Sequence, residues 1–211
     1  MTRATSLLIA ALALLLLTAP VAVTAAYATP ITFVASLRGD NEVPPTGSPG
    51  TGFATVVLDP AAHTMHVDVA FSGLRGPTTA AHIHCCLPSP LASGVNAMVA
   101  TTTPTFTGFP LGVTSGTYSH DFDLTLASSY NPAFITSAFN PSGTIAGAEA
   151  ALEAGIGNGE TYLNIHTALP LGFPGGEIRG FLVAPEPGTL LLPGAGLAGL
   201  SGVTWRRHRR K

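Results

Sequence analysis

The sequence predicts a mainly β fold, a Greek-key β-sandwich that carries a short helical insert. Between the two ends of the chain, apolar and polar residues alternate with a period of two in seven short segments, which is the pattern of half-buried strands. The same region is poor in charge and rich in glycine, proline, threonine and serine. That composition suits short strands joined by tight turns and long loops.

The N-terminal segment predicts export. Residues 1–28 begin with Arg3, continue through an almost wholly apolar stretch at 7–23, and end in the small-x-small sequence Ala26-Tyr27-Ala28. These features are typical of a secretory signal peptide cut after Ala28. An N-terminal membrane helix is the alternative, but no stop-transfer charges follow the apolar stretch. Residues 29–184 remain, and they suit one domain with its own core.

The elements of this domain follow from its periodicity. The predicted strands are 31–37, 52–58, 65–71, 79–85, 116–126, 161–166 and 177–183. A long surface loop is predicted at 87–115, with one short strand near Met98, and the last two strands form a hairpin with a loop at 167–176. Short helices are predicted at 128–138 and 144–156. In the second of these, Ala148, Leu152 and Ile156 recur at helical spacing. Seven or eight strands in one domain favour the sandwich.

Charge and cysteine content exclude some classes of partner. Residues 29–184 contain three arginines, no lysine and ten acidic residues, for a net charge near −7, which argues against binding to nucleic acid or anionic lipid. The two cysteines, Cys85 and Cys86, are adjacent and cannot join distant segments. Three states stay open for them: a vicinal disulfide formed after export, a thiolate that joins a metal site, or two buried thiols.

The C-terminus carries a three-part signal at residues 185–211. Pro185-Glu186-Pro187 precedes an apolar run at 188–203, and five of the chain's nine Lys and Arg lie in its last six residues. The run is barely long enough for a transmembrane helix, and the basic cluster would hold that end in the cytoplasm. This layout resembles the PEP-CTERM sorting signal of Gram-negative bacteria. The resemblance implies transient anchoring in the inner membrane, cleavage by an exosortase-type membrane protease, and release to the cell surface or extracellular matrix. A plain single-pass anchor is the alternative.

Four motifs stand in order within the domain. They are Glu42-Val43-Pro44-Pro45, Ala80-Ala81-His82-Ile83-His84, Tyr162-Leu163-Asn164-Ile165-His166-Thr167 and Gly176-Glu177-Ile178-Arg179-Gly180. Together they resemble the CHRD domain, named after chordin, over residues 33–183. The resemblance implies an extracellular β-sandwich of the immunoglobulin or superoxide-dismutase kind, without a settled activity.

No hydrolase motif accompanies these segments: the sequence has no Gly-x-Ser-x-Gly elbow, Gly-rich phosphate loop or His-Glu-x-x-His. We therefore expect a non-enzymatic binding or structural module, with an extracellular polysaccharide or surface matrix as its partner.

The histidines suggest a metal site. His82 and His84 are two apart in a predicted strand and share a face, and the residues between and before them are apolar. The two histidines therefore point outward or into a loop-covered cleft. His166 shares the non-core face of a later strand with Asn164. If the strands are close, three imidazoles could hold Cu(II) or Zn(II). The His-x-His is similar to the copper arrangement of copper-zinc superoxide dismutases. The alternative function is thus a secreted copper- or zinc-binding protein with a redox role of that kind.

Further residues are weaker candidates. His120 could be a fourth ligand, and Cys85 or Cys86 could add a thiolate. Glu177 could orient His166 as a carboxylate behind the metal, or form an exposed ion pair with Arg179. Glu42 is interpreted as a turn element.

Overall fold

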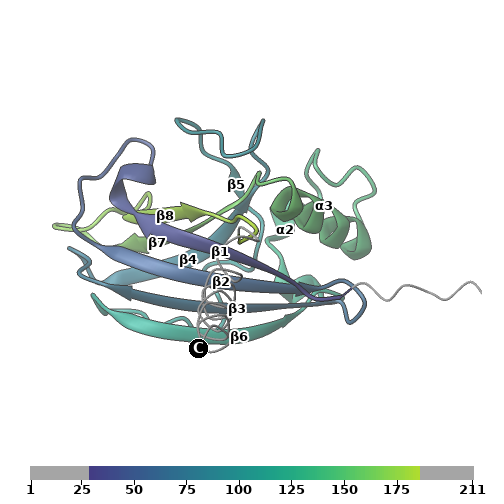
Figure 1. Cartoon of the computed structure of the whole chain (residues 1–211), viewed down its shortest axis with the longest axis horizontal. Coiled ribbons are helices and arrows are strands. Elements are labelled where there is room, and N and C mark those ends of the chain that lie inside the picture. The colour runs from purple at the N-terminus through teal and green to yellow at the C-terminus, as the bar shows by residue number, and fades with distance from the viewer. Residues whose placement is uncertain (1–28, 186–211) are drawn as a thin grey trace, which may run out of the picture.

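Residues 29–185 are described by a computed structural model, in which eight strands form one antiparallel sheet (Figure 1). Their order across the sheet is β5-β4-β7-β8-β1-β2-β3-β6. The strands are β1 (Ile31–Arg38), β2 (Thr51–Asp59), β3 (Thr64–Ser72), β4 (Thr78–Cys85), β5 (Met98–Val99), β6 (Gly116–Asp123), β7 (Tyr162–Thr167) and β8 (Ile178–Phe181). The prediction of a mainly β fold is confirmed. The two predicted layers are the two halves of one curled sheet.

Alternating apolar residues build the core from one face of this sheet. In β3, for example, Met65, Val67, Val69 and Phe71 are buried while the residues between them are partly or fully exposed. The predicted strands all exist, with shifted ends. The strand predicted at 116–126 ends at Asp123, because an Asp123 carboxylate oxygen accepts hydrogen bonds from the Thr125 amide and hydroxyl and turns the chain. The short strand predicted near Met98 is β5.

The other half of the sheet is covered on both faces. Residues 81–85 of β4 are buried without interruption, and so are nearly all of β7. Alternation cannot explain this burial, because every second side chain points away from the core. Loops cover that second face: residues 97–104 contact the β4 histidines, and Glu42 contacts Asn164 of β7. Of the two predicted environments, outward-facing or covered by loops, the structure shows the covered one for His82 and His84.

The helical insert is smaller than predicted. The helix predicted at 128–138 is wrong: this stretch holds a 3-10 turn, η3 (Ala127–Ser129), and a one-turn helix, α2 (Pro132–Ile135). Pro132 disfavours a helical conformation at the preceding Asn131, so the chain is extended there and Asn131 caps the new turn with its side chain. The predicted helix at 144–156 is present as α3 (Ile145–Gly157), capped by Thr144. It buries Ala148, Leu152 and Ile156 as expected.

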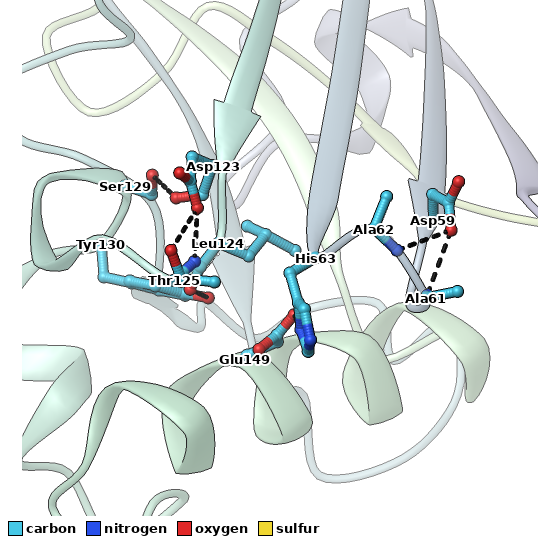
Figure 2. Close-up of polar contacts among 10 residues, drawn as sticks. All are labelled: Asp59, Ala61, Ala62, His63, Asp123, Leu124, Thr125, Ser129, Tyr130 and Glu149. Atoms are coloured by element: carbon cyan, nitrogen blue, oxygen red, sulfur yellow. Dashed lines mark hydrogen bonds and ion pairs between the residues drawn. The ribbon is translucent and has the colours of Figure 1, made fainter.

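Side-chain contacts tie this insert to the sheet (Figure 2). His63, in the turn between β2 and β3, contacts Glu149 of α3 through its Nδ1 atom at 2.8 Å. Its φ of 55° places it in the left-handed region. The Tyr130 hydroxyl donates to the Leu124 carbonyl at 2.9 Å, and the Ser129 hydroxyl donates to the Asp123 carbonyl at 2.6 Å. These bonds hold the start of the insert against the end of β6.

Both targeting segments lie outside the described residues. The predicted signal peptide, 1–28, and residues 186–211, with the apolar run and basic tail, are not described. Within 29–185, no helix is long and apolar enough to cross a membrane. At the end of the described chain, the Val183 backbone exchanges two hydrogen bonds with Val34 of β1. Pro185, the first residue of the sorting motif, therefore follows the last sheet contact by two residues.

Candidate metal centre

Two neighbouring strands bring three histidines together. β4 carries His82 and His84, and β7 carries Asn164 and His166. In the antiparallel register, His82 lies opposite Asn164, and Ala80 lies opposite His166. Side chains two residues apart share a face, so His82, His84, Asn164 and His166 all point to the covered side. The ring centroids of His82 and His166 are 5.3 Å apart, and that of His84 is 6.0 Å from His82 and 6.2 Å from His166.

Backbone carbonyls determine which nitrogen of each ring carries the proton. His82 Nε2 lies 2.8 Å from the Pro104 oxygen, His84 Nδ1 2.8 Å from the Ala97 oxygen, and His166 Nδ1 2.8 Å from the Pro174 oxygen. A carbonyl oxygen can only accept, so each of these nitrogens donates a proton. The opposite nitrogen of each neutral ring then carries a free lone pair. Hydrogen bonding of the far nitrogen to a carbonyl is how proteins orient histidines that ligate metals.

The three rings bring nitrogen atoms close together. One ring nitrogen from each of His82, His84 and His166 lies within 4.8 Å of the others. His82 Nδ1 and His166 Nε2 are 3.4 Å apart. Two nitrogens bound to one ion at 2.0–2.1 Å in tetrahedral geometry would be about 3.3–3.4 Å apart. His84 Nε2 is buried and has no hydrogen-bond partner. The donor set and spacing therefore fit a transition-metal ion.

Burial keeps these rings neutral. His82 is 6% exposed and His84 is 8% exposed. Burial lowers the pKa of His82 and of His84 to about 4, and it lowers the pKa of His166 as well. Burial disfavours the charged form because imidazolium loses its hydration. Metal binding requires neutral imidazole, so near neutral pH the rings are already in the form that can bind.

A stacked layer supports the site from behind. The His84 ring stacks on Tyr162 with centroids 4.7 Å apart, and the Arg179 guanidinium lies 4.4 Å from the centre of the Tyr162 ring. β7 lies between β4 and β8, so His84 and Arg179 approach Tyr162 from opposite sides. The layer restricts the rotation of the His84 ring.

Other predicted candidates lie elsewhere. His120 is on β6, where its ring packs against Phe122 with centroids 4.7 Å apart, and it is not part of the histidine group. Glu177 is fully buried, and its carboxylate accepts from Ser48, Arg75, Gly76 and Thr167. The acceptor for His166 Nδ1 is instead the Pro174 carbonyl. The exposed ion pair predicted between Glu177 and Arg179 is wrong, because both side chains are fully buried and each has its own set of partners.

Cys85 and Cys86 form a disulfide with each other, the first of the three states that the sequence left open. The sulfurs lie against α3: a Cβ atom at Gly155 would be 2.4 Å from the Cys85 sulfur. Neither cysteine belongs to the histidine group. The disulfide therefore packs the end of β4 against the helix. Because the two sulfurs are bonded to each other, neither is a thiolate.

Two residues near the histidines were not predicted from the sequence to be members of a site. Glu42, interpreted as a turn element, is 5% exposed, and its Oε1 accepts from Asn164 Nδ2 at 3.4 Å. Asn164 is 2% exposed. The only signal for Asn164 in the sequence was its position two residues before His166, which places both side chains on one face.

Glu42 should make stability depend on pH in an identifiable way. Burial raises its pKa to about 7, against the lowering effects of the Arg179 charge and the Asn164 hydrogen bond. The folded protein therefore binds a proton at Glu42 more tightly than the unfolded chain does. The stabilisation that results from this proton is present below about pH 4.5 and is lost as pH rises through 7. We expect Glu42→Gln to be more stable than the wild type at pH 8, by about 1–3 kcal/mol, and similar at pH 4.5. Urea unfolding with a chelator present measures both values.

The buried histidines change the stability with pH in the opposite direction. Their pKa values are lowered, so their contribution is present above pH 6.5 and is lost as pH falls through about 4. In the wild type the two effects oppose each other between pH 4.5 and 6.5. The Glu42→Gln variant should therefore lose stability more steeply on acidification than the wild type. A stability difference between the two proteins that is constant from pH 4.5 to 8 would contradict this account of Glu42.

Comparison with known proteins accounts for nearly all of the chain after the N-terminal segment. The family described as the CHRD domain matches residues 33–182, and the PEP-CTERM protein-sorting motif matches residues 183–210. No curated protein and no solved structure matches the chain. The sorting motif implies export, sorting to the cell surface in Gram-negative bacteria, and processing by exosortase, a membrane protein. Since the first match spans well over half of the sequence, the chain belongs to the CHRD domain family and carries a C-terminal PEP-CTERM sorting motif.

Proposed function

We propose that this exported CHRD domain acts at the cell surface as a binding module for a copper or zinc ion, held by His82, His84 and His166. Binding, and not catalysis, is the proposed role. The proposal joins the two functions that the sequence suggested, a surface binding module and a secreted metal-binding protein. Export supports it, because ions outside the cytoplasm are available to a surface protein.

One observation carries the proposal. The lone pairs of His82 Nδ1 and His166 Nε2 face each other at 3.4 Å, because the other nitrogen of each ring donates to a carbonyl. Two acceptors at that separation repel each other when nothing lies between them. A cation bound by both would turn the repulsion into attraction. A buried polar atom without a partner costs about 1–3 kcal/mol, and His84 Nε2 is such an atom in the same place.

The surroundings favour a bound ion over three unrelated histidines. The three carbonyls that orient the rings come from residues 97, 104 and 174, in two separate loops. Histidines that served only as polar surface residues would not need a buried face and three orienting acceptors. Imidazole ligands suit copper and zinc. The extracellular polysaccharide or matrix partner stays a prediction, which binding assays with the purified polymer would test separately.

Calorimetric titration of the exported protein with Cu(II) and Zn(II) tests the proposal. Loss of a ligand should weaken binding at least as much as loss of an orienting partner, which costs about 10–100-fold. We therefore expect His82→Ala and His166→Ala each to weaken binding on the order of 100-fold. His120→Ala is the matched control, because this histidine is also on a strand but outside the group, and it should bind like the wild type. Equal weak binding by all four proteins would refute the proposal.

A further inference from the structure

We propose that Asn164 supplies the fourth ligand of this metal site, through its carboxamide oxygen, and thereby closes the site. The inference rests on the proposed function, since it concerns the ion held by the three histidines. A site closed in this way would retain its ion and would leave no coordination position open for a substrate. Glu42 is proposed as the residue that positions the amide.

The backbone places Asn164 among the histidines. It lies directly opposite His82 in the β4–β7 ladder and two residues before His166 on the same strand. Directly opposed side chains have Cβ atoms about 4.5–5.5 Å apart. His84 is the diagonal neighbour of Asn164 in the same ladder, because it lies opposite Tyr162, two residues before Asn164. Asn164 therefore adjoins all three proposed ligands.

Glu42 and Gly176 hold the amide nitrogen of Asn164 in place. Asn164 Nδ2 donates to Glu42 Oε1 at 3.4 Å. Gly176 approaches both groups so closely that a Cβ there would be 2.4 Å from Asn164 Nδ2 and 2.6 Å from Glu42 Oε1. Gly176 has a φ of 128°, a conformation that side chains with a Cβ rarely adopt. A glycine at this position thus allows the loop to close over the amide nitrogen.

The carboxamide oxygen is left buried and unpaired. Asn164 is 2% exposed, and its Oδ1 atom has no hydrogen-bond partner. Buried polar groups in folded proteins almost always have partners. Two unpaired buried acceptors, Asn164 Oδ1 and His84 Nε2, therefore occur on neighbouring strands within one site. A single cation between them would satisfy both.

A fourth protein ligand decides what kind of site this is. Zinc sites with four protein ligands are structural, whereas catalytic sites keep one position open for water or substrate. Three imidazole nitrogens and one amide oxygen complete a tetrahedron, so a redox or hydrolytic substrate would find no vacant position. The superoxide-dismutase-like role would require such a position.

Cobalt(II) substitution tests the coordination directly. Tetrahedral Co(II) absorbs visible light more strongly than five- or six-coordinate Co(II). We expect the full-length wild-type protein loaded with Co(II) to show the strong tetrahedral spectrum and no change on addition of azide. Asn164→Ala should bind at least 10-fold more weakly, since loss of an orienting partner alone costs about 10–100-fold, and it should gain an azide-dependent spectral change, because a position has opened. Asn164→Asp keeps an oxygen ligand and should keep the tetrahedral spectrum without an azide response.

The positioning role of Glu42 has its own pair of variants. Glu42→Gln keeps an oxygen that can accept from Asn164 Nδ2, and it should retain the wild-type Co(II) spectrum. Glu42→Ala removes the acceptor, and it should broaden the spectrum and allow azide to bind. A purely structural role would change stability in both variants and leave the spectrum of the folded protein unaltered.

The outcomes separate the two proposals. If the wild type binds no Co(II), Zn(II) or Cu(II), the proposed function fails. If it binds them with His82 and His166 but already responds to azide, the site is open and the inference about Asn164 fails alone. The same holds if Asn164→Ala matches the wild type in affinity and spectrum. Should Asn164→Ala not fold, the azide response of the wild type and of Asn164→Asp still decides.

Discussion

Replacement of Glu177 by alanine is expected to lower the free energy of unfolding by about 3–5 kcal/mol, because a buried hydrogen-bond network is lost. Its carboxylate is fully buried and accepts four hydrogen bonds, from the Ser48 hydroxyl at 2.5 Å, the Arg75 amide at 2.6 Å, the Gly76 amide at 3.3 Å and the Thr167 hydroxyl at 2.6 Å. Alanine would leave the two backbone amides without an acceptor, and each buried unpaired donor costs about 1–3 kcal/mol. The loss is a large part of the stability of a typical domain.

The reason for so large an effect is that Glu177 joins segments far apart in sequence. The 46–50 loop, the 73–77 turn and the end of β7 all meet at this carboxylate. Urea unfolding measures the change. Glu177→Gln preserves the shape but offers one acceptor oxygen in place of two, so it should also be destabilising. Asp40→Asn is the control, since Asp40 is exposed, and it should change stability by less than about 0.5 kcal/mol. A Glu177→Ala effect below about 1 kcal/mol would mean that water replaces the carboxylate.

Replacement of Arg179 by alanine should have a comparable effect, about 3–5 kcal/mol, because its buried hydrogen bonds are lost. Its guanidinium is fully buried, donates to the Asn41 and Val95 carbonyls and to Asn96 Oδ1, and packs on Tyr162. Alanine would leave these acceptors unpaired and would remove the cation from one face of the Tyr162 ring. Arg179→Lys should recover only part of the loss, because an ammonium group cannot reproduce the planar fork of donors.

The chain provides a matched control for this arginine. Arg38 is the cross-strand partner of Arg179 in the β1–β8 ladder, but it is exposed. Arg38→Ala should therefore change the free energy of unfolding by less than about 0.5 kcal/mol. Equal effects of the two alanine variants in urea unfolding would show that the burial of Arg179 does not explain its contribution to stability. Arg179→Ala should also raise the pKa of Glu42 further, because the Arg179 charge lowers it.

Elements with local signals were predictable from the sequence. Alternation located all seven predicted strands, and Thr144 with helical apolar spacing located α3. The helix predicted at 128–138 failed because the effect of Pro132 on Asn131 outweighed the apolar residues around it. The His-x-His spacing showed that two imidazoles share a face, and the structure brings His166 beside them. That last step needed the pairing of β4 with β7, which joins segments about 80 residues apart in sequence.

The sequence by itself determined the mainly β architecture, the sorting motif, the family and the common face of His82 and His84, because these depend on residue type and short-range periodicity. Only the tertiary structure decided the burial of Glu177 and Arg179, the role of Glu42, and the enclosure of Asn164 between Glu42 and Gly176. Those properties arise from loops that fold over the second face of β4 and β7. Hydrophobic alternation indicates which side of a strand faces the core, but it carries no information about what covers the other side.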